Sequence, residues 1–202
     1  MLNQFSNISC YEEFEIQCAL NGISKIDALK EIGHQTDDYY FFISKDGIFN
    51  WFDLNGNHIE NPGILKELKE EYIPLSISKC IIPNGVTIIK HGTFFDCNLL
   101  TSITIPNTVI SIDNEALRYC DSLISITIPD NVANIGNLVF SFCKLLKEIT
   151  IPDSITSIGY CAFFGCNSLK EVIFKGKTLD QIKQMKNYPF GIEDESIIKC
   201  EL

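Results

Sequence analysis

The chain has 202 residues, 46% of them hydrophobic, and this length and composition predict a folded core and exclude a disordered protein. The formal net charge of −10 argues against a nucleic-acid partner, because binding to a phosphate backbone relies on clustered Lys and Arg. The apolar stretches are only a few residues long, so we expect no membrane-spanning segment.

The charge is unevenly distributed along the chain. Residues 1–75 contain 13 acidic and 5 basic residues (net −8), whereas residues 76–202 contain 13 acidic and 11 basic residues (net −2). Two segments with such different charge balances are predicted to be separate structural units. We predict an acidic α+β N-terminal domain at 1–75, a repeat region at 76–174 and a C-terminal cap at 175–202.

The N-terminal sequence and the number of cysteines indicate in which cellular compartment the protein is located. Residues 1–14 lack the basic start and the apolar core of a secretion signal. Nine cysteines are an odd number, which does not suit a fully disulfide-bonded secreted protein. We therefore expect reduced thiols and a cytoplasmic location.

Two helices are predicted first. Ser9, followed three residues later by Glu12, is typical of a helix N-terminus, and we expect that helix to end at Asn21 and Gly22. Ser24 is predicted to cap a second helix that ends at Gly33.

Strands are predicted next. Residues 39–44 and 48–54 are expected to be strands, and Asn55-Gly56 is a strong hairpin signal that leads to a further strand at 58–59. Pro62 is then predicted to begin a helix that runs through Tyr72, with Leu65 and Leu68 against the first coil of the region that follows.

An internal repeat of 23 residues dominates the rest of the chain. Six apolar positions keep the same period as the proline and cysteine positions over four copies without an insertion, which chance does not explain. The positions that define the period are Pro83, Pro106, Pro129 and Pro152, and Cys97, Cys120, Cys143 and Cys166.

Each copy predicts one coil of a solenoid. Leu100, Ile103 and Ile105 alternate as in a strand, and Pro106 ends that strand because proline lacks an amide donor. The Val-x-x-Ile segment that follows is expected to return to the core, as a second short strand. Residues 115–117 are predicted to form a turn of α-helix or 3₁₀-helix. One coil cannot bury its own apolar face, so consecutive coils must stack.

The repeat Leu-x-x-Ile-x-Ile-Pro-x-x-Val-x-x-Ile-x-x-x-Ala-Phe-x-x-Cys closely resembles the BspA-like leucine-rich repeats, over residues 77–175. The segments at 102–107 and 125–130 are especially similar. The resemblance implies an α/β-type leucine-rich-repeat solenoid of four to five coils, with a parallel sheet on one face that serves as a recognition surface. Many relatives are secreted or surface adhesins, and this chain departs from them in its N-terminus.

The period breaks after Phe174. Thr178 and Gln181 form a capping box that predicts a helix, with Leu179, Ile182 and Met185 on one side against the last coil. Residues 187–191 are expected to end the helix, and residues 196–202 to return as a strand.

Neither a metal site nor a catalytic site is predicted. The four repeat cysteines occupy the same place in successive coils, without the close pairs that zinc sites use, so we expect a buried ladder of thiols. The three histidines, His34, His58 and His91, show no spacing to a nucleophile that identifies a triad, and the sequence has no phosphate loop. We expect no cofactor and no enzymatic activity.

The outward positions of the predicted strands are the candidate binding residues. They are Ser102, Thr104, Ser125, Thr127, Glu148, Thr150, Glu171 and Ile173, flanked by Lys79 and Ile81. Threonine also simply suits the outside of a strand. As a row, these residues predict a platform for a protein ligand.

The aromatic residues between 39 and 52 are a second candidate. Alternation would leave half of them outside, as an apolar patch rimmed by acidic residues; the alternative is that they fill a small core. The acidic rim would be Asp37, Asp38, Asp46 and Asp53.

We therefore predict a non-enzymatic module that binds a protein partner. One alternative is an acidic mimic of nucleic acid that blocks a basic groove, which requires carboxylates spaced like phosphates on one surface. Another is a surface adhesin, which requires a secretion signal upstream of residue 1.

Overall fold

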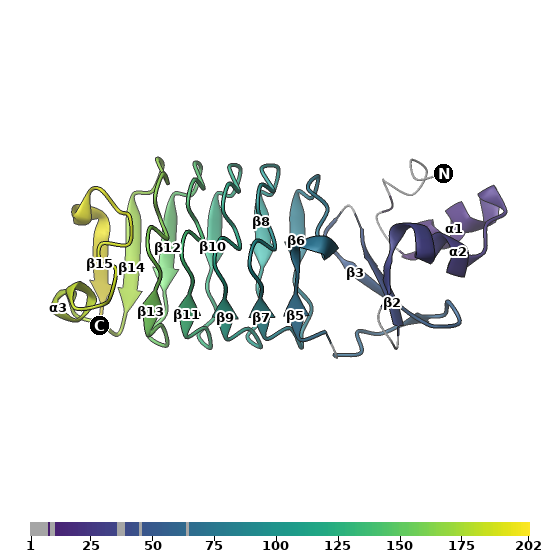
Figure 1. Cartoon of the computed structure of the whole chain (residues 1–202), viewed down its shortest axis with the longest axis horizontal. Helices are drawn as coiled ribbons and strands as arrows, with labels where there is room; N and C mark the ends of the chain where they lie inside the picture. Colours follow the sequence, from purple (N-terminus) through teal and green to yellow (C-terminus); the bar gives the residue numbers. More distant parts are fainter. Residues whose placement is uncertain (1–7, 9–10, 36–38, 45, 64) are drawn as a thin grey trace.

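The computed structural model describes residues 8, 11–35, 39–44, 46–63 and 65–202. Figure 1 shows an elongated molecule with two helices and a small sheet at one end, a stack of coils as its body, and a short helix and a final strand at the other end. Within these ranges no helix is long and apolar enough to cross a membrane.

The two predicted helices are present. α1 spans Tyr11–Asn21 and α2 spans Lys25–Ile32. The Ser24 side chain accepts a hydrogen bond from an amide in the first turn of α2, and Gly33 follows its last residue, so both boundaries are confirmed. The predicted cap of α1, Ser9, lies outside the described residues.

A four-stranded antiparallel sheet follows, in the order β1-β2-β3-β4. The predicted hairpin at Asn55-Gly56 is confirmed, since it joins β3 to β4. The strands are β1 (His34–Gln35), β2 (Tyr39–Ile43), β3 (Phe49–Asp53) and β4 (His58–Ile59).

Of the two alternatives for the aromatic residues of this sheet, the core is confirmed and the exposed patch is wrong. All seven aromatic side chains are buried: Tyr39, Tyr40, Phe41, Phe42, Phe49, Trp51 and Phe52. Phe42 and Phe52 pack with the helices, whereas Phe41 and Trp51 belong to the core of the solenoid. Both faces of the sheet are covered, so alternation leaves no ring outside. Asp46 is exposed, Asp53 is half-buried, and Asp37 and Asp38 lie outside the described residues.

The predicted helix from Pro62 to Tyr72 is also wrong. The segment contains the two-residue strand β5 (Glu67–Leu68) and the 3₁₀ turn η2 (Glu70–Tyr72). β5 pairs in parallel with β7, so this segment is already part of a coil. Pairing with the neighbouring coil overrides local helix propensity. Leu65 and Leu68 are buried in the solenoid core, which confirms their predicted contact.

One side of the solenoid is formed by its longer parallel strands, which we call the wide face. β10, β12, β14 and β15 form one sheet, and β8 lies beside β10 and pairs with β6. Equivalent residues pair across coils, as Ile126 does with Ile149. The strands are β6 (Lys79–Ile81), β8 (Ser102–Thr104), β10 (Ser125–Thr127), β12 (Glu148–Ile151), β14 (Glu171–Lys175) and β15 (Ile198–Glu201).

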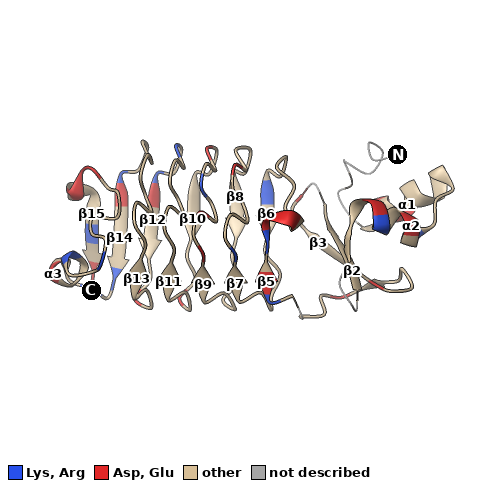
Figure 2. Ribbon diagram, in the orientation of Figure 1, with Lys and Arg blue, Asp and Glu red and all other residues tan. Residues whose placement is uncertain are grey.

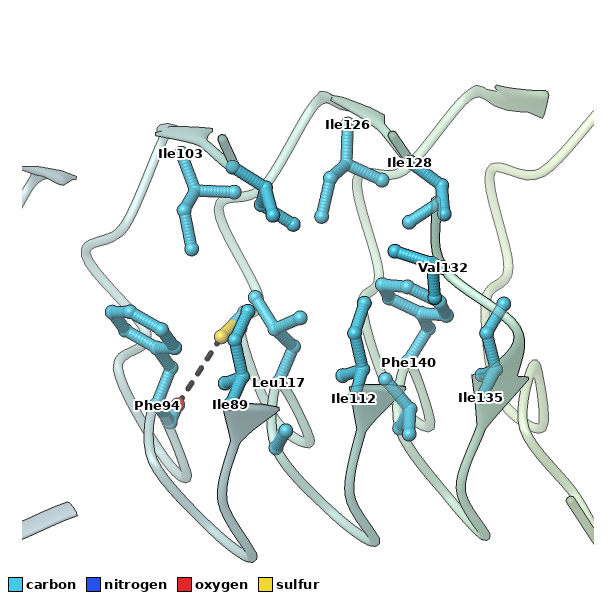
Figure 3. Packing of buried hydrophobic residues seen from close by; sticks show 14 of the residues in the cluster. Ile89, Phe94, Ile103, Ile112, Leu117, Ile126, Ile128, Val132, Ile135 and Phe140 are labelled. Atoms are coloured by element: carbon cyan, nitrogen blue, oxygen red, sulfur yellow. Dashed lines mark hydrogen bonds between the residues drawn. The ribbon is translucent and has the colours of Figure 1, made fainter. Parts of the chain in front are cut away.

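A second, narrower parallel sheet forms another side, in the order β13-β11-β9-β7-β5. Its strands confirm that the Val-x-x-Ile segment returns as a short strand. They are β7 (Ile88–Ile89), β9 (Ser111–Ile112), β11 (Asn134–Ile135) and β13 (Ser157–Ile158). Figure 3 shows the side chains of both sheets meeting between the layers, with Ile103 and Ile126 facing Ile112 and Ile135 across the core.

The third side contains turns, so the prediction of a helix at residues 115–117 is wrong. Glu115 has a φ of 57°, which a right-handed helix does not allow. Amides here donate to the following coil: Phe94 N to Ala116 O at 2.7 Å, and Leu117 N to Val139 O at 3.1 Å. Stacked coils therefore supply the hydrogen bonds that a helix would have made internally.

The C-terminal segment closes the core. α3 spans Leu179–Lys183, begins at the predicted capping box of Thr178 and Gln181, and buries Ile182 completely. Leu179 is 42% exposed, so its predicted packing against the last coil is wrong. A 3₁₀ turn, η3 (Glu195–Ile197), leads into β15, which pairs in parallel with β14 and confirms the predicted final strand.

Candidate functional site

The wide face carries the predicted binding residues in two straight columns. Of these, Ser102, Thr104, Ser125, Thr127, Glu148 and Glu171 are exposed, and Thr150 and Ile173 are half-buried. Strand register places Ser125 beside Glu148 and Thr127 beside Thr150. Because neighbouring strands lie about 4.8 Å apart, the columns form one strip, with short Ser and Thr side chains on β8 and β10.

The two ends of this strip differ in chemistry. Lys79 and Ile81 begin it, and the Ile81 side chain is 50% exposed. At the other end, Glu148 pairs in register with Glu171 on the next strand. Like charges directly side by side are destabilising by some tenths of a kcal/mol, so this end attracts a cationic group more than the middle does.

A shallow hollow of about 390 Å³ lies on the narrow sheet and was not predicted. Gly136 and Gly159 line this hollow, and neither position has room for a side chain. A Cβ added to Gly136 would lie 2.5 Å from Asn114 N, and one added to Gly159 would lie 2.3 Å from Asn137 N. The Asn137 side chain accepts a hydrogen bond from Tyr160 N at 2.7 Å. The sequence signal for this hollow is the pair of glycines that follow Ile135 and Ile158 at the same position of consecutive repeats.

A second hollow, of about 720 Å³, lies between the N-terminal sheet and the first coil. His58 stacks on Tyr11 at its border, with ring centroids 4.1 Å apart. Ile48 and Ile81 line it and are about half exposed. Only the tertiary structure brings these residues together, since they come from four separate segments.

A ladder of four aromatic rings runs along the turn side of the coils. Phe95, Tyr119, Phe142 and Phe164 follow one another with centroid distances of 5.6, 5.0 and 5.4 Å. The Arg118 guanidinium lies 4.8 Å from the Tyr119 ring centroid. Because consecutive rings contact each other, their main effect is to stabilise coil stacking.

Comparison with known proteins identifies the repeat. A sequence model described as BspA type leucine rich repeat region matches residues 70–191 with six copies. The chain belongs to this family. The six copies exceed the four to five coils predicted from the sequence, and the match begins at η2, inside the segment that we had predicted to be a helix.

Solved structures of other leucine-rich-repeat proteins share the fold. One from T. pallidum is 30% identical with a TM-score of 0.51, and the match covers 53% of this chain and 51% of that one. One from Bacteroides ovatus is 35% identical with a TM-score of 0.54, covering 62% and 30%. The pneumococcal vaccine antigen PcpA is 26% identical with a TM-score of 0.51, covering 74% and 38%.

This BspA-type chain therefore spans about half the length of the first of these proteins and less than two fifths of the other two. No match was found among curated proteins. Leucine-rich-repeat solenoids generally serve as scaffolds that bind protein partners.

The cysteine ladder of the BspA-type coils lies in the core. Cys97, Cys120 and Cys143 are buried as predicted, whereas Cys166 is only partly buried. The Cys120 thiol donates to Phe94 O at 3.3 Å, and the next two ladder thiols repeat this bond. Burial raises the pKa of Cys97 and of Cys166 to about 12. Thiols held in the neutral form are poor nucleophiles and poor metal ligands.

The histidines lie apart from one another. His34 is half-buried with its ring 5.1 Å from Tyr72, and burial lowers its pKa. His58 stacks on Tyr11, and His91 borders the hollow of the narrow sheet. Among the described residues, no group of three or more His, Cys, Asp or Glu side chains is placed to hold a metal ion.

The acidic residues do not form a single row. Figure 2 shows Asp and Glu on α1, on α2, near η2 and on the coils. Some are neutralised by lysine: Glu15 pairs with Lys25 at 2.5 Å and Glu67 with Lys90 at 3.3 Å. Mimicry of a phosphate backbone requires regularly spaced carboxylates on one surface, and this distribution does not favour it.

Proposed function

We propose that this protein is a non-enzymatic binding module that holds a protein partner on the wide face. The observation that carries the proposal is the set of outward side chains on five consecutive strands, β6 to β14, all at least partly open to solvent. β6 pairs with β8, and β10, β12 and β14 pair in one sheet, and all five strands lie over a continuous core. Such a surface changes little on binding, which lowers the entropic cost of association.

The chemistry of the face favours a particular kind of partner. Thr104 and Thr127 supply hydroxyl groups that lose little conformational entropy when they are ordered. Ile81 and Ile173 supply apolar contact at opposite ends. The neighbouring Glu148 and Glu171 favour a basic side chain of the partner, because charge complementarity sets orientation and association rate.

Site-specific photo-crosslinking tests the proposal. A photoreactive residue at position 127 should crosslink a partner in a lysate of the source organism, and mass spectrometry then identifies that partner. The same photoreactive residue at position 98 is the control, since Asn98 is exposed on a turn outside the strands of the wide face. Equal capture at both positions would contradict the proposal.

Affinity for the identified partner provides the second measurement. Replacement of Thr104, Thr127 and Thr150 by Arg should weaken binding about 30-fold or more, since hot-spot losses reach roughly 2 kcal/mol. Replacement of the exposed Asn98 and Asn167 by Arg is the matched control and should leave the affinity unchanged. Thermal melting should show both variants folded.

We also propose that the protein works in a reducing compartment. The eight described cysteines are all unpaired, and most of them are buried where oxidation would disrupt packing. Cell fractionation of the source organism with an antibody tests this, and recovery at the cell surface would support an adhesin role instead.

A further inference from the structure

The two ends of the wide face are finished differently. At the N-terminal end, the turn between β2 and β3 covers the outer edge of β6, with Ile81 N donating to Gly47 O at 2.9 Å. At the C-terminal end, β15 is the last strand, and within the described part of the chain β14 is its sole strand neighbour. Lys199, Cys200 and Glu201 of β15 are all exposed. An exposed strand edge of this kind is a template for another strand.

The backbone groups on this edge can be assigned from one hydrogen bond. Gly176 on the β14 side donates to the carbonyl of Glu201 at 2.8 Å, so the polar backbone groups of Glu201 face β14. Successive residues of a strand direct these groups to opposite sides. Cys200 therefore presents its N–H and C=O to the outer edge, in the middle of the exposed segment.

The side chains around Cys200 are self-complementary. In an antiparallel pair centred on this residue, Cys200 of each copy faces Cys200 of the other, and the two exchange both backbone hydrogen bonds. Lys199 of each copy then faces Glu201 of the other on the same face, which gives two opposite-charge pairs. We propose that β15 is a homodimerisation edge, at which two copies of this chain join through a two-fold axis at Cys200.

The charge of the surrounding segment permits this approach. Residues 175–202 contain five lysines and five acidic residues, so their charges cancel. The N-terminal 75 residues have a net charge of −8 and repel each other at the opposite end. Association through the C-terminal end is thus the less repulsive of the two end-to-end arrangements.

The pairing makes one continuous sheet from two wide faces. It involves a short strand, so the interface falls below the area of a stable obligate dimer, and the complex is a weak one in fast exchange. Two copies of any surface on the chain are then presented together, which raises avidity for a repetitive partner. The proposal stands independently of whether the wide face binds a protein.

Charge reversal tests the register. Sedimentation velocity at high micromolar concentration should show a dimer for the wild-type chain, and K199E or E201K should weaken it at least tenfold, because each change creates two like-charge pairs. An equimolar mixture of K199E and E201K should restore the dimer as a heterodimer, and the K199E/E201K double variant should restore the homodimer. A dimer that survives both single reversals, or that the mixture fails to restore, would overturn the proposal.

Oxidation provides an independent measurement on the unmodified edge. The two facing residues of a hydrogen-bonded antiparallel pair have Cα atoms about 5.5 Å apart, within reach of a disulfide. Diamide should therefore crosslink the wild-type chain through Cys200 to Cys200, as mapped by mass spectrometry. C200S should still dimerise in sedimentation without crosslinking at this strand. A monomeric wild-type chain that gives no such crosslink contradicts the proposal.

Discussion

The carbonyl of Gly47 accepts a hydrogen bond of 2.9 Å from the amide of Ile81 and so joins the N-terminal hairpin to the first strand of the wide face. Gly47 has a φ of 77°, and its Cα lies so close to β6 that an added Cβ would be 2.0 Å from the carbonyl oxygen of Lys79. This contact makes the N-terminal domain a cap, because it covers the strand edge where association with other chains would otherwise begin.

Gly47→Ala should therefore destabilise the protein by about 3 kcal/mol, the sum of overpacking and a left-handed backbone in a residue with a side chain. The measurement is the free energy of unfolding in urea. Gly22→Ala is the matched control, since Gly22 has a φ of 64° but nothing within 4 Å of an added Cβ. It should cost only about 1 kcal/mol. Equal losses for the two variants would show that the close approach to β6 does not matter.

Ile182→Asp should open the C-terminal end of the core. Ile182 is fully buried, and an unpaired carboxylate in its place should cost about 3 kcal/mol or more. Leu179→Asp, on the same helix, should change stability by about 0.5 kcal/mol, because Leu179 is 42% exposed. The shift of the urea midpoint distinguishes the two. Similar midpoints for both variants would mean that α3 does not cap the core.

Alkaline pH should destabilise the fold through the cysteine ladder. Burial raises the pKa of the Cys97 thiol from 9.0 to about 12. It also raises the pKa values of the Cys120 and Cys143 thiols well above 9.0. Above pH 9 the folded state therefore keeps protons that the unfolded state releases. The contribution of these thiols to the free energy of unfolding is complete below pH 9 and declines as the pH rises from 9 toward 12. Each such thiol contributes a slope of up to about 1.4 kcal/mol per pH unit.

The measurement is the free energy of unfolding as a function of pH between 8 and 11. Cys120→Ala should reduce this slope by the contribution of one buried thiol. A slope that Cys120→Ala does not alter would mean that the Cys120 thiol ionises equally well in the folded protein.

Tyr119→Ala should loosen the turn side of the coils. Its ring lies 5.6 Å from Phe95 and 5.0 Å from Phe142, so two aromatic contacts are lost, each of about 0.5–1.5 kcal/mol beyond the buried area. Phe164→Ala removes one contact at the end of the ladder and should cost about half as much. Thermal melting measures both. A larger loss for Phe164 would indicate that ring stacking is not the source of the stability.

The sequence by itself determined the repeat, the alternation on the wide face and the helix caps. The period is a spacing along the covalent chain. The positions of Cys120 and Ile126 therefore recur every 23 residues, independently of the backbone conformation between them. The outward positions Thr104 and Thr127 follow from the two-residue period of a strand. The caps at Ser24 and Thr178 depend on side chains within three residues of the backbone that they bind.

The tertiary structure decided the segments whose partners lie one coil away. Glu67 and Leu68 form a strand because they pair with Ile88 and Ile89. Leu117 is not helical, because its amide donates to Val139 O of the next coil. Phe41 and Phe42 lie on opposite faces of one sheet, yet both are buried because helices cover one face and the solenoid covers the other. Local propensity and periodicity do not describe contacts with a segment that is distant in sequence. In a solenoid, the neighbouring coil is such a segment, and it supplies backbone hydrogen bonds and burial.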